Sequence, residues 1–338
     1  MHAAKTQRAG TGREVGDVVL EVQELEVGVR THGQGAGPSI IRDVSFSLRA
    51  QEVVAVVGES GSGKSTLCHA VVDLLADNLT ITAGTVRVGG GKDLTTASPA
   101  ELRRSRGREV GMVFQDPLAA LNPVRRIGAQ LAEARILHGV ENRSQAMQWA
   151  RKQLAALGFD DPDAVLRAYP HMLSGGMRQR VCVAIAFSAD PKVVIADEPT
   201  TSLDVSLQGR LLQLLLAEMS AVGSGLLLVS HDIAVVRAMA DSIIVMYGGR
   251  MLERGPAAQL LTRPRSPYTR ALLDALPSLD RGTRGAPLPT ITGGSDGGTG
   301  TGCPFRSRCP NALDRCAEFP PEDRDGAEHS YWCWNPGR

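Results

Sequence analysis

The sequence of 338 residues lacks long apolar runs, an excess of charge of either sign, and an apolar segment near its N-terminus. No apolar run approaches the about 18 residues that a membrane-spanning helix needs, so we expect any work at a membrane to depend on a partner. Residues 1–17 lack the apolar core of a secretory signal and are interpreted as a disordered tail. The 37 lysines and arginines nearly balance the 36 acidic residues. This balance argues against binding to nucleic acid through a broad basic surface.

Cysteines are scarce in most of the chain and concentrated at its end. Cys68 and Cys182 each lie in apolar surroundings and are expected in the core. Because no export signal is present, a disulfide framework is not expected, and the clustering of the others favours a metal site. These others are Cys303, Cys309, Cys316 and Cys333.

Short apolar runs rich in valine and isoleucine alternate with segments of helical spacing along the first three quarters of the chain. The runs are typical of buried strands that have helices on both faces. Strand–helix alternation predicts an α/β fold with a largely parallel sheet. The predicted strands are 53–57, 192–197, 225–230 and 242–247, and helical spacing is clearest at 127–157 and 211–219.

Changes in composition divide the chain further. A main domain is expected over 18–262, with an antiparallel addition formed by 18–27 and 40–48. The stretch 124–190 is too helical for a single crossover and suggests an inserted helical subdomain. A helix and a Gly/Pro-rich linker follow at 263–302, since this composition cannot support a packed core. The cysteine-rich segment 303–338 completes the chain.

A phosphate-binding loop follows the predicted strand 53–57. Gly58, Gly63, Lys64 and Ser65 fit the G-x-x-x-x-G-K-[ST] pattern between a strand and a helix. The glycines let backbone N–H groups surround phosphates, the lysine reaches the β- and γ-phosphate oxygens, and the serine hydroxyl binds Mg²⁺. A Gly-rich turn with a solvated lysine is the alternative, but it would not require all four positions.

Two acidic residues end another predicted strand. Asp197 closes a buried strand, where a carboxylate needs a partner such as Mg²⁺, held directly or through water. Glu198 follows at once and would orient or deprotonate an attacking water. Capping of the next helix by this acidic pair is the alternative, and the phosphate loop makes it the weaker interpretation.

Further motifs carry a resemblance to a known family. LSGGMRQR occupies 173–180, TSLD occupies 201–204, Gln115 lies in VFQDP, and His231 follows the predicted strand 225–230. Alone, these would be a helix N-cap, a turn glutamine and a core histidine. Together with the phosphate loop, they resemble the nucleotide-binding subunit of an ATP-binding cassette (ABC) transporter over about 18–275.

The resemblance implies a phosphate-loop ATPase fold that hydrolyses ATP with Mg²⁺. Two such domains would enclose two ATP molecules, each held between one chain's phosphate loop and the other chain's LSGG. It assigns catalysis to Glu198 and His231, and Mg²⁺ binding to Ser65, Gln115 and Asp197. Within one chain, the nucleotide would also contact Gly58, Glu59, Ser60, Gly61, Ser62, Gly63, Lys64, Thr66 and Gln115. From the facing chain it would contact Leu173, Ser174, Gly175, Gly176 and Met177, with Asp204 in the adjoining loop.

Two departures from the family pattern stand out. The aromatic residue that usually stacks on adenine is missing, so either Val29 or Arg30 would pack on the base or discrimination between bases would be loose. Met172 precedes LSGG where related importers often carry a glutamate, which concerns coupling to the membrane partner.

Three segments resemble the oligopeptide/dipeptide/nickel importer group: 114–131, LSGGMRQRV, and 263–277 followed by the cysteine tail. The resemblance implies the first of two non-identical ATPase subunits, two transmembrane permease subunits and an extracytoplasmic solute-binding protein. The expected location is the cytoplasmic face of the cell membrane. Short peptides are the expected solute, with nickel, a metallophore or another small solute as alternatives. A non-transport ABC ATPase is the remote alternative.

The last four cysteines are separated by 5, 6 and 16 residues. Structural zinc sites usually contain closely spaced pairs of ligands, which are absent here. Four thiolates with wider spacing suit an iron–sulfur cluster. Tails that this one resembles can carry a [4Fe–4S] cluster, so we expect one at Cys303, Cys309, Cys316 and Cys333, in a structural or regulatory role, with zinc as the alternative.

Overall fold

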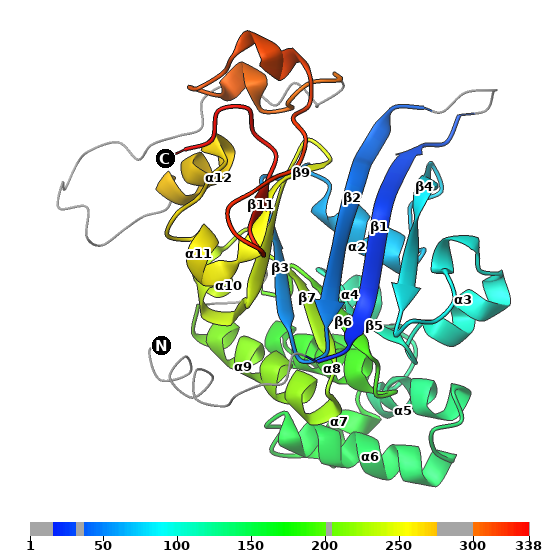
Figure 1. Cartoon of the computed structure of the whole chain (residues 1–338). Coiled ribbons are helices and arrows are strands. Elements are labelled where there is room, and N and C mark those ends of the chain that lie inside the picture. Colours follow the sequence, from blue (N-terminus) through cyan, green and yellow to red (C-terminus); the bar gives the residue numbers. More distant parts are fainter. Residues whose placement is uncertain (1–15, 32–36, 201–204, 276–299, 338) are drawn as a thin grey trace.

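The computed structural model describes residues 16–31, 37–200, 205–275 and 300–337 (Figure 1). Most of the predicted N-terminal tail, most of the predicted linker and Asp204 lie outside these ranges. None of the helices in the described part is both long and apolar enough to cross a membrane.

The centre of the fold is an eight-stranded sheet of order β10-β11-β9-β8-β3-β7-β6-β5. Five neighbouring strands are parallel, and β9, β11 and β10 extend the sheet in antiparallel pairs. Every side chain of β3, β6 and β7 is buried, as expected for a sheet covered on both faces. The predicted α/β fold is therefore confirmed. The strands are β3 (Val53–Val57), β5 (Val110–Val113), β6 (Val193–Asp197), β7 (Gly225–Val229), β8 (Ser242–Tyr247), β9 (Arg250–Pro256), β10 (Asp323–Arg324) and β11 (Ser330–Tyr331).

A second, antiparallel sheet has the order β2-β1-β4. It consists of β1 (Val18–Val29), β2 (Ser39–Arg49) and β4 (Leu79–Val88). The two strands predicted for this addition are present, and β4 was not predicted. Buried residues of this sheet, such as Leu20 and Leu48, share a core with Leu67 of the helix that follows the phosphate loop.

Helices α4 to α8 lie between β5 and β6 in the sequence, and α5, α6 and α7 lie below the two sheets in Figure 1. They share a hydrophobic core of their own that includes Leu131, Leu154 and Val181. Local sequence sets their starts: Asn142 caps α6 in a reciprocal pair with Gln145. The helices are α4 (Pro117–Ala120), α5 (Ile127–Leu137), α6 (Arg143–Ala156), α7 (Pro162–Arg167) and α8 (Gly175–Phe187).

The remaining helices surround the central sheet: α2 (Lys64–Val71), α3 (Pro99–Ser105), α9 (Val205–Val222), α10 (Ile233–Met239), α11 (Ala257–Leu260) and α12 (Pro267–Asp274). Residues 300–337 lie over α12 and β9 (Figure 1). They attach through the β9–β11 pairing and through a fully buried contact between His329 Nε2 and Glu253 Oε1, 2.7 Å apart. Phe305 is also buried, between Tyr247 and Tyr268.

Candidate functional site

The candidate site lies where the parallel strands β3, β7, β6 and β5 reach their carboxyl ends. In an open α/β sheet, ligands bind at this edge because the loops after the strands converge there. The loop after β3 carries the glycine-rich motif. The residues just after β5, β6 and β7 include Gln115, Glu198 and His231.

The loop between β3 and α2 depends on glycine for its shape. Gly63 caps α2 with φ of 101°, in the left-handed region. A Cβ atom on Gly58 would lie 2.1 Å from the carbonyl oxygen of Met246, so only glycine fits beside β8. The loop therefore presents its backbone N–H groups at the start of α2, which is the arrangement that binds phosphate.

Lys64 is folded back over this loop. Its buried Nζ donates hydrogen bonds to the carbonyl oxygens of Gly58 at 2.8 Å and Glu59 at 2.9 Å. Burial lowers the pKa of Lys64, and the nearby carboxylates of Glu198 and Asp197 oppose that effect. A buried ammonium group is thus held inside the loop where an anion would bind.

Ser65 and Asp197 form a pair beside the lysine. Ser65 Oγ donates a hydrogen bond of 3.0 Å to Asp197 Oδ1 at the end of β6. Burial raises the pKa of Asp197, and the hydrogen bond from Ser65 partly offsets this. A buried carboxylate beside a hydroxyl is a donor set that suits Mg²⁺, whose charge would compensate the cost of burial.

Glu198 connects two further residues of the site. Its Oε2 accepts a hydrogen bond of 3.2 Å from Gln115 Nε2 and lies 3.2 Å from His231 Nδ1. The Glu198 backbone has φ of 44°, an uncommon left-handed conformation fixed by its N–H bond to the carbonyl of Val229. The glutamate is largely buried, whereas the His231 side chain is 59% exposed. The structure thus brings together residues from three loops, which follow β5, β6 and β7.

The segment 173–177 begins helix α8 in another part of the fold. Ser174 caps the helix by accepting a hydrogen bond of 3.3 Å from the N–H of Met177. Ser174, Gly176 and Met177 line a pocket of about 260 Å³ together with residues of α9. A Cβ on Gly175 would meet no atom within 4 Å, so this helix start is open to a large ligand.

Three residues concern adenine binding or coupling to the membrane partner. Arg30 is exposed just after β1, and its N–H donates to the carbonyl of Asn78 at 2.7 Å, while Val29 is half-buried. Met172 is 64% exposed.

The sequence did not indicate the contacts that Glu59 makes. The carboxylate of this phosphate-loop residue pairs with Arg308, and its backbone N–H donates to the hydroxyl of Tyr268. Arg308 lies 249 positions further along the chain, and no local spacing marks such a pairing.

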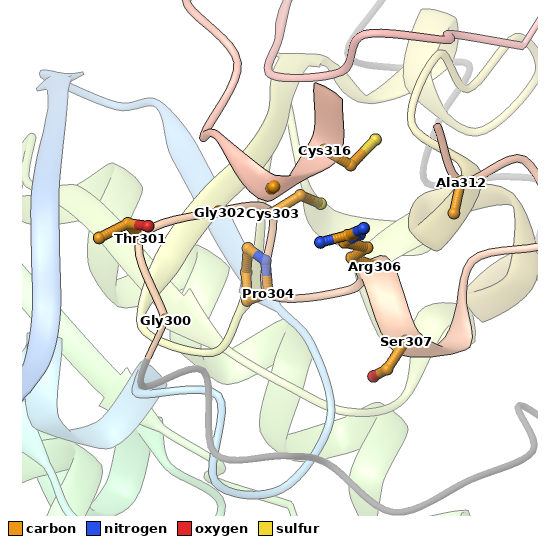
Figure 2. Close-up of a pocket in the computed structure, with 10 residues that line it drawn as sticks. Gly300, Thr301, Gly302, Cys303, Pro304, Arg306, Ser307, Ala312 and Cys316 are labelled. Atoms are coloured by element: carbon orange, nitrogen blue, oxygen red, sulfur yellow. The ribbon is translucent and has the colours of Figure 1, made fainter. Parts of the chain in front are cut away.

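The four C-terminal cysteines line one narrow cavity, of about 20 Å³, with Phe305 and Trp332. Burial raises the pKa of Cys303 and of Cys333 to about 11 in each case. Cys303 and Cys316 also border a wider pocket of about 540 Å³, in which Figure 2 shows them around Arg306. Among the described residues, no group of three or more His, Cys, Asp or Glu is arranged to hold a metal ion. The predicted cluster or zinc site is therefore not supported by this arrangement.

Comparison with known proteins gives two family matches. Residues 41–201 match the ABC transporter family, and 252–316 match the C-terminal region of oligopeptide/dipeptide transporters. The oligopeptide transport ATP-binding protein OppD of Escherichia coli is 36% identical over 99% of this chain and 98% of its own length. The chain belongs to the ATP-binding proteins of peptide ABC transporters.

Other members of this family are similar over nearly the whole chain. The dipeptide transport ATP-binding protein DppD of Bacillus subtilis is 38% identical, with 94% of each protein covered. OppD of Mycobacterium tuberculosis is 43% identical over 93% of this chain, which spans only 51% of that relative's length.

A dimeric ATP-binding cassette bound to ADP and Pi superposes with a TM-score of 0.61 at 24% identity. The match covers 70% of this chain and 98% of the cassette. It supports the fold assignment, which is that of an ABC ATPase cassette.

Replacing Lys64 tests the phosphate loop. We expect Lys64→Ala to weaken MgATP binding at least tenfold, about 1.4 kcal/mol, because it removes the buried positive charge from the loop. Isothermal titration calorimetry measures the change. Lys92→Ala is the matched control, since Lys92 is exposed and pairs with Glu101 on the surface. Equal affinity in the Lys64→Ala and wild-type chains would remove Lys64 from the site.

Proposed function

We propose that this chain is the ATP-hydrolysing subunit of an ABC importer for short peptides. The observation that carries the proposal is the convergence of Lys64, Ser65, Asp197, Glu198 and His231 at one edge of the sheet. The family relationship supports it, since the relatives named above are oligopeptide and dipeptide transport ATP-binding proteins.

The residues divide the work of hydrolysis. The N–H groups of loop 58–66 and the Lys64 ammonium bind the β- and γ-phosphates. Ser65 and Asp197, with Gln115, would hold Mg²⁺, which neutralises phosphate charge when bound. Glu198 accepts the proton of the attacking water. Gln115 and His231 hold the Glu198 carboxylate in place. His231 is exposed enough to reach the γ-phosphate. Val29 or Arg30 packs on the adenine.

The second half of each ATP site comes from a facing cassette. Leu173–Met177 would supply it, because the start of α8 offers N–H groups and glycines to a γ-phosphate. Asp204, which lies outside the described residues, is assigned to the loop beside this interface only because the family resemblance implies it. We assign the facing chain to a second, non-identical ATPase subunit, so the working unit is a heterodimer.

The other partners are two membrane permeases and an extracytoplasmic solute-binding protein. Large apolar side chains are exposed on and near the helices between β5 and β6: Leu118, Val124, Leu137 and Met172. We assign these residues to the interface with the permeases, and docking there would place the chain at the cytoplasmic face of the membrane. We assign the helical subdomain to about 124–190, the ATPase domain to 18–262, the helix and linker to 263–302 and the cysteine appendage to 303–338.

Short peptides are the proposed solute. Nickel, a metallophore or another small solute remains the alternative within the same importer group, because the binding protein and permeases select the solute. Genes for a peptide-binding protein, two permeases and a second ATPase beside this one would support the proposal. A gene alone among ribosomal or repair functions would favour a non-transport ATPase.

For the cysteine segment we retain a [4Fe–4S] cluster as the proposed cofactor. The support is that all four cysteines line one cavity, although as many as 16 residues separate successive ones. Their wide spacing suits an iron–sulfur cluster better than zinc, whose ligands usually come in closely spaced pairs. Cluster binding would need the four thiols deprotonated, so it would be favoured by higher pH.

The role of Glu198 is tested by Glu198→Gln. This variant should bind ATP but hydrolyse it at least about 100-fold more slowly, the scale of a general base. Phosphate release under saturating MgATP measures the rate, with Glu101→Gln as the surface control. Wild-type turnover in Glu198→Gln would end the assignment.

The shared ATP site predicts little turnover by an isolated chain. Activity should appear when the chain is purified together with its second ATPase subunit. Light scattering gives the oligomeric state of each sample, and phosphate release gives its rate. Robust turnover by a monomer, independent of protein concentration, would contradict a site completed in trans.

The cluster is tested by iron analysis of protein purified without oxygen. The wild-type chain should contain about four iron atoms and absorb light at about 400 nm. The Cys309→Ser variant should lose both the iron and this absorption. Ser307→Ala is the control, since Ser307 borders the wider pocket but not the cysteine cavity. A colourless preparation with one zinc per chain would assign the site to zinc instead.

A further inference from the structure

The C-terminal part of the chain holds the phosphate loop at Glu59. Arg308 Nη1 donates to Glu59 Oε2 at 2.7 Å, and Arg308 Nη2 donates to Glu59 Oε1 at 3.0 Å. This is a two-point pairing of guanidinium and carboxylate, which fixes orientation as well as distance. From α12, the Tyr268 hydroxyl accepts a hydrogen bond of 2.9 Å from the Glu59 N–H. Both the backbone and the side chain of Glu59 are thus held from outside the loop.

The arginine itself is fixed by its surroundings. Its side chain is 6% exposed, and Nη1 also donates to the Tyr247 hydroxyl at 2.9 Å. Tyr247, Tyr268 and Phe305 form a cluster with ring centroids 4.7 to 5.3 Å apart, and the guanidinium lies 5.7 Å from the Tyr247 ring. The hydrogen bond to Glu59 raises the pKa of Arg308, and burial partly opposes this effect.

The charge of Glu59 makes this pairing relevant to the ligand. A carboxylate in a loop that binds phosphates opposes the binding of an anion through electrostatic repulsion. Arg308 neutralises that carboxylate and turns it toward the C-terminal segment. Without Arg308, an unpaired and partly buried charge would be left beside the phosphates.

We propose that Arg308 is a positioning residue for the phosphate loop, so that tight binding of a nucleoside triphosphate depends on the docked segment 303–309. The proposal rests on the proposed ATPase function and adds a residue from outside the cassette motifs. Because Arg308 directly precedes Cys309, it also joins the loop to the cavity of the four cysteines.

The test compares MgATP affinity and turnover in Arg308→Ala, Arg308→Lys, Glu59→Gln and the double variant Arg308→Ala/Glu59→Gln. The full-length chain is used with its ATPase partner. Arg308→Ala should raise the Kd of MgATP about tenfold or more, since hydrogen bonds to charged groups are the stronger class. Turnover at saturating MgATP should change less than about twofold, because Arg308 does not touch the reacting atoms.

The double variant distinguishes positioning from simple support of the fold. In the double variant, Glu59→Gln removes the carboxylate that Arg308→Ala leaves unpaired, and this should restore much of the MgATP affinity lost in Arg308→Ala. Arg308→Lys keeps the charge but not the two-point pairing, and should lie between wild type and Arg308→Ala. Arg306→Ala is the matched control. Arg306 has the same charge as Arg308, lies with it in the short 3-10 helix Arg306–Arg308 and is exposed.

Three results would be decisive. Wild-type affinity in Arg308→Ala and Arg308→Lys would overturn the proposal. Weakened binding that Glu59→Gln does not relieve would also overturn it, because the effect would then come from loss of packing. Failure of the wild-type chain to bind MgATP at all would instead contradict the proposed function.

Discussion

The backbone hydrogen bonds between β3, β7, β6 and β5 determine where the chemistry of this chain can occur. They align Leu226 of β7 with Val53 of β3 on one side and with Val194 of β6 on the other, so the strands end at one edge of the sheet. The buried side chains of these strands stabilise this register, because a shift by one residue would change which face each side chain occupies. The loop after β3 and the residues after β5, β6 and β7 meet at that edge as a consequence.

Once gathered, the site residues depend on one another electrostatically. Burial disfavours the charged forms of both Lys64 and Asp197, and each is stabilised by the other's charge. Lys64 donates hydrogen bonds to the loop carbonyls, and Asp197 accepts one from Ser65, so both buried charged groups have hydrogen-bond partners. The site is therefore prepared for an anion and a cation together, which is the charge pattern of a metal-bound triphosphate.

The sequence predicted those parts of the fold that have local signals. Apolar runs marked β3, β6, β7 and β8, and residues at fixed offsets after them marked the phosphate loop and the acidic pair. Strand β4 and the short strands β10 and β11 carried no such signal, because tertiary contacts decide the pairing of β4 with β1, of β11 with β9 and of β10 with β11. The pairs Arg308–Glu59 and His329–Glu253 were missed for the same reason. Each joins residues far apart in the chain, and the partners have no pattern of their own.

Equilibrium dialysis of the wild-type protein with labelled ATP, in the presence and absence of Mg²⁺, shows whether the edge of the parallel sheet is an ATP site of this chain. We expect saturable binding close to one ATP per chain that is strengthened by Mg²⁺ and displaced by ADP. If a folded chain bound no ATP under these conditions, or bound it without regard to Mg²⁺, this edge of the sheet would not be an ATP site.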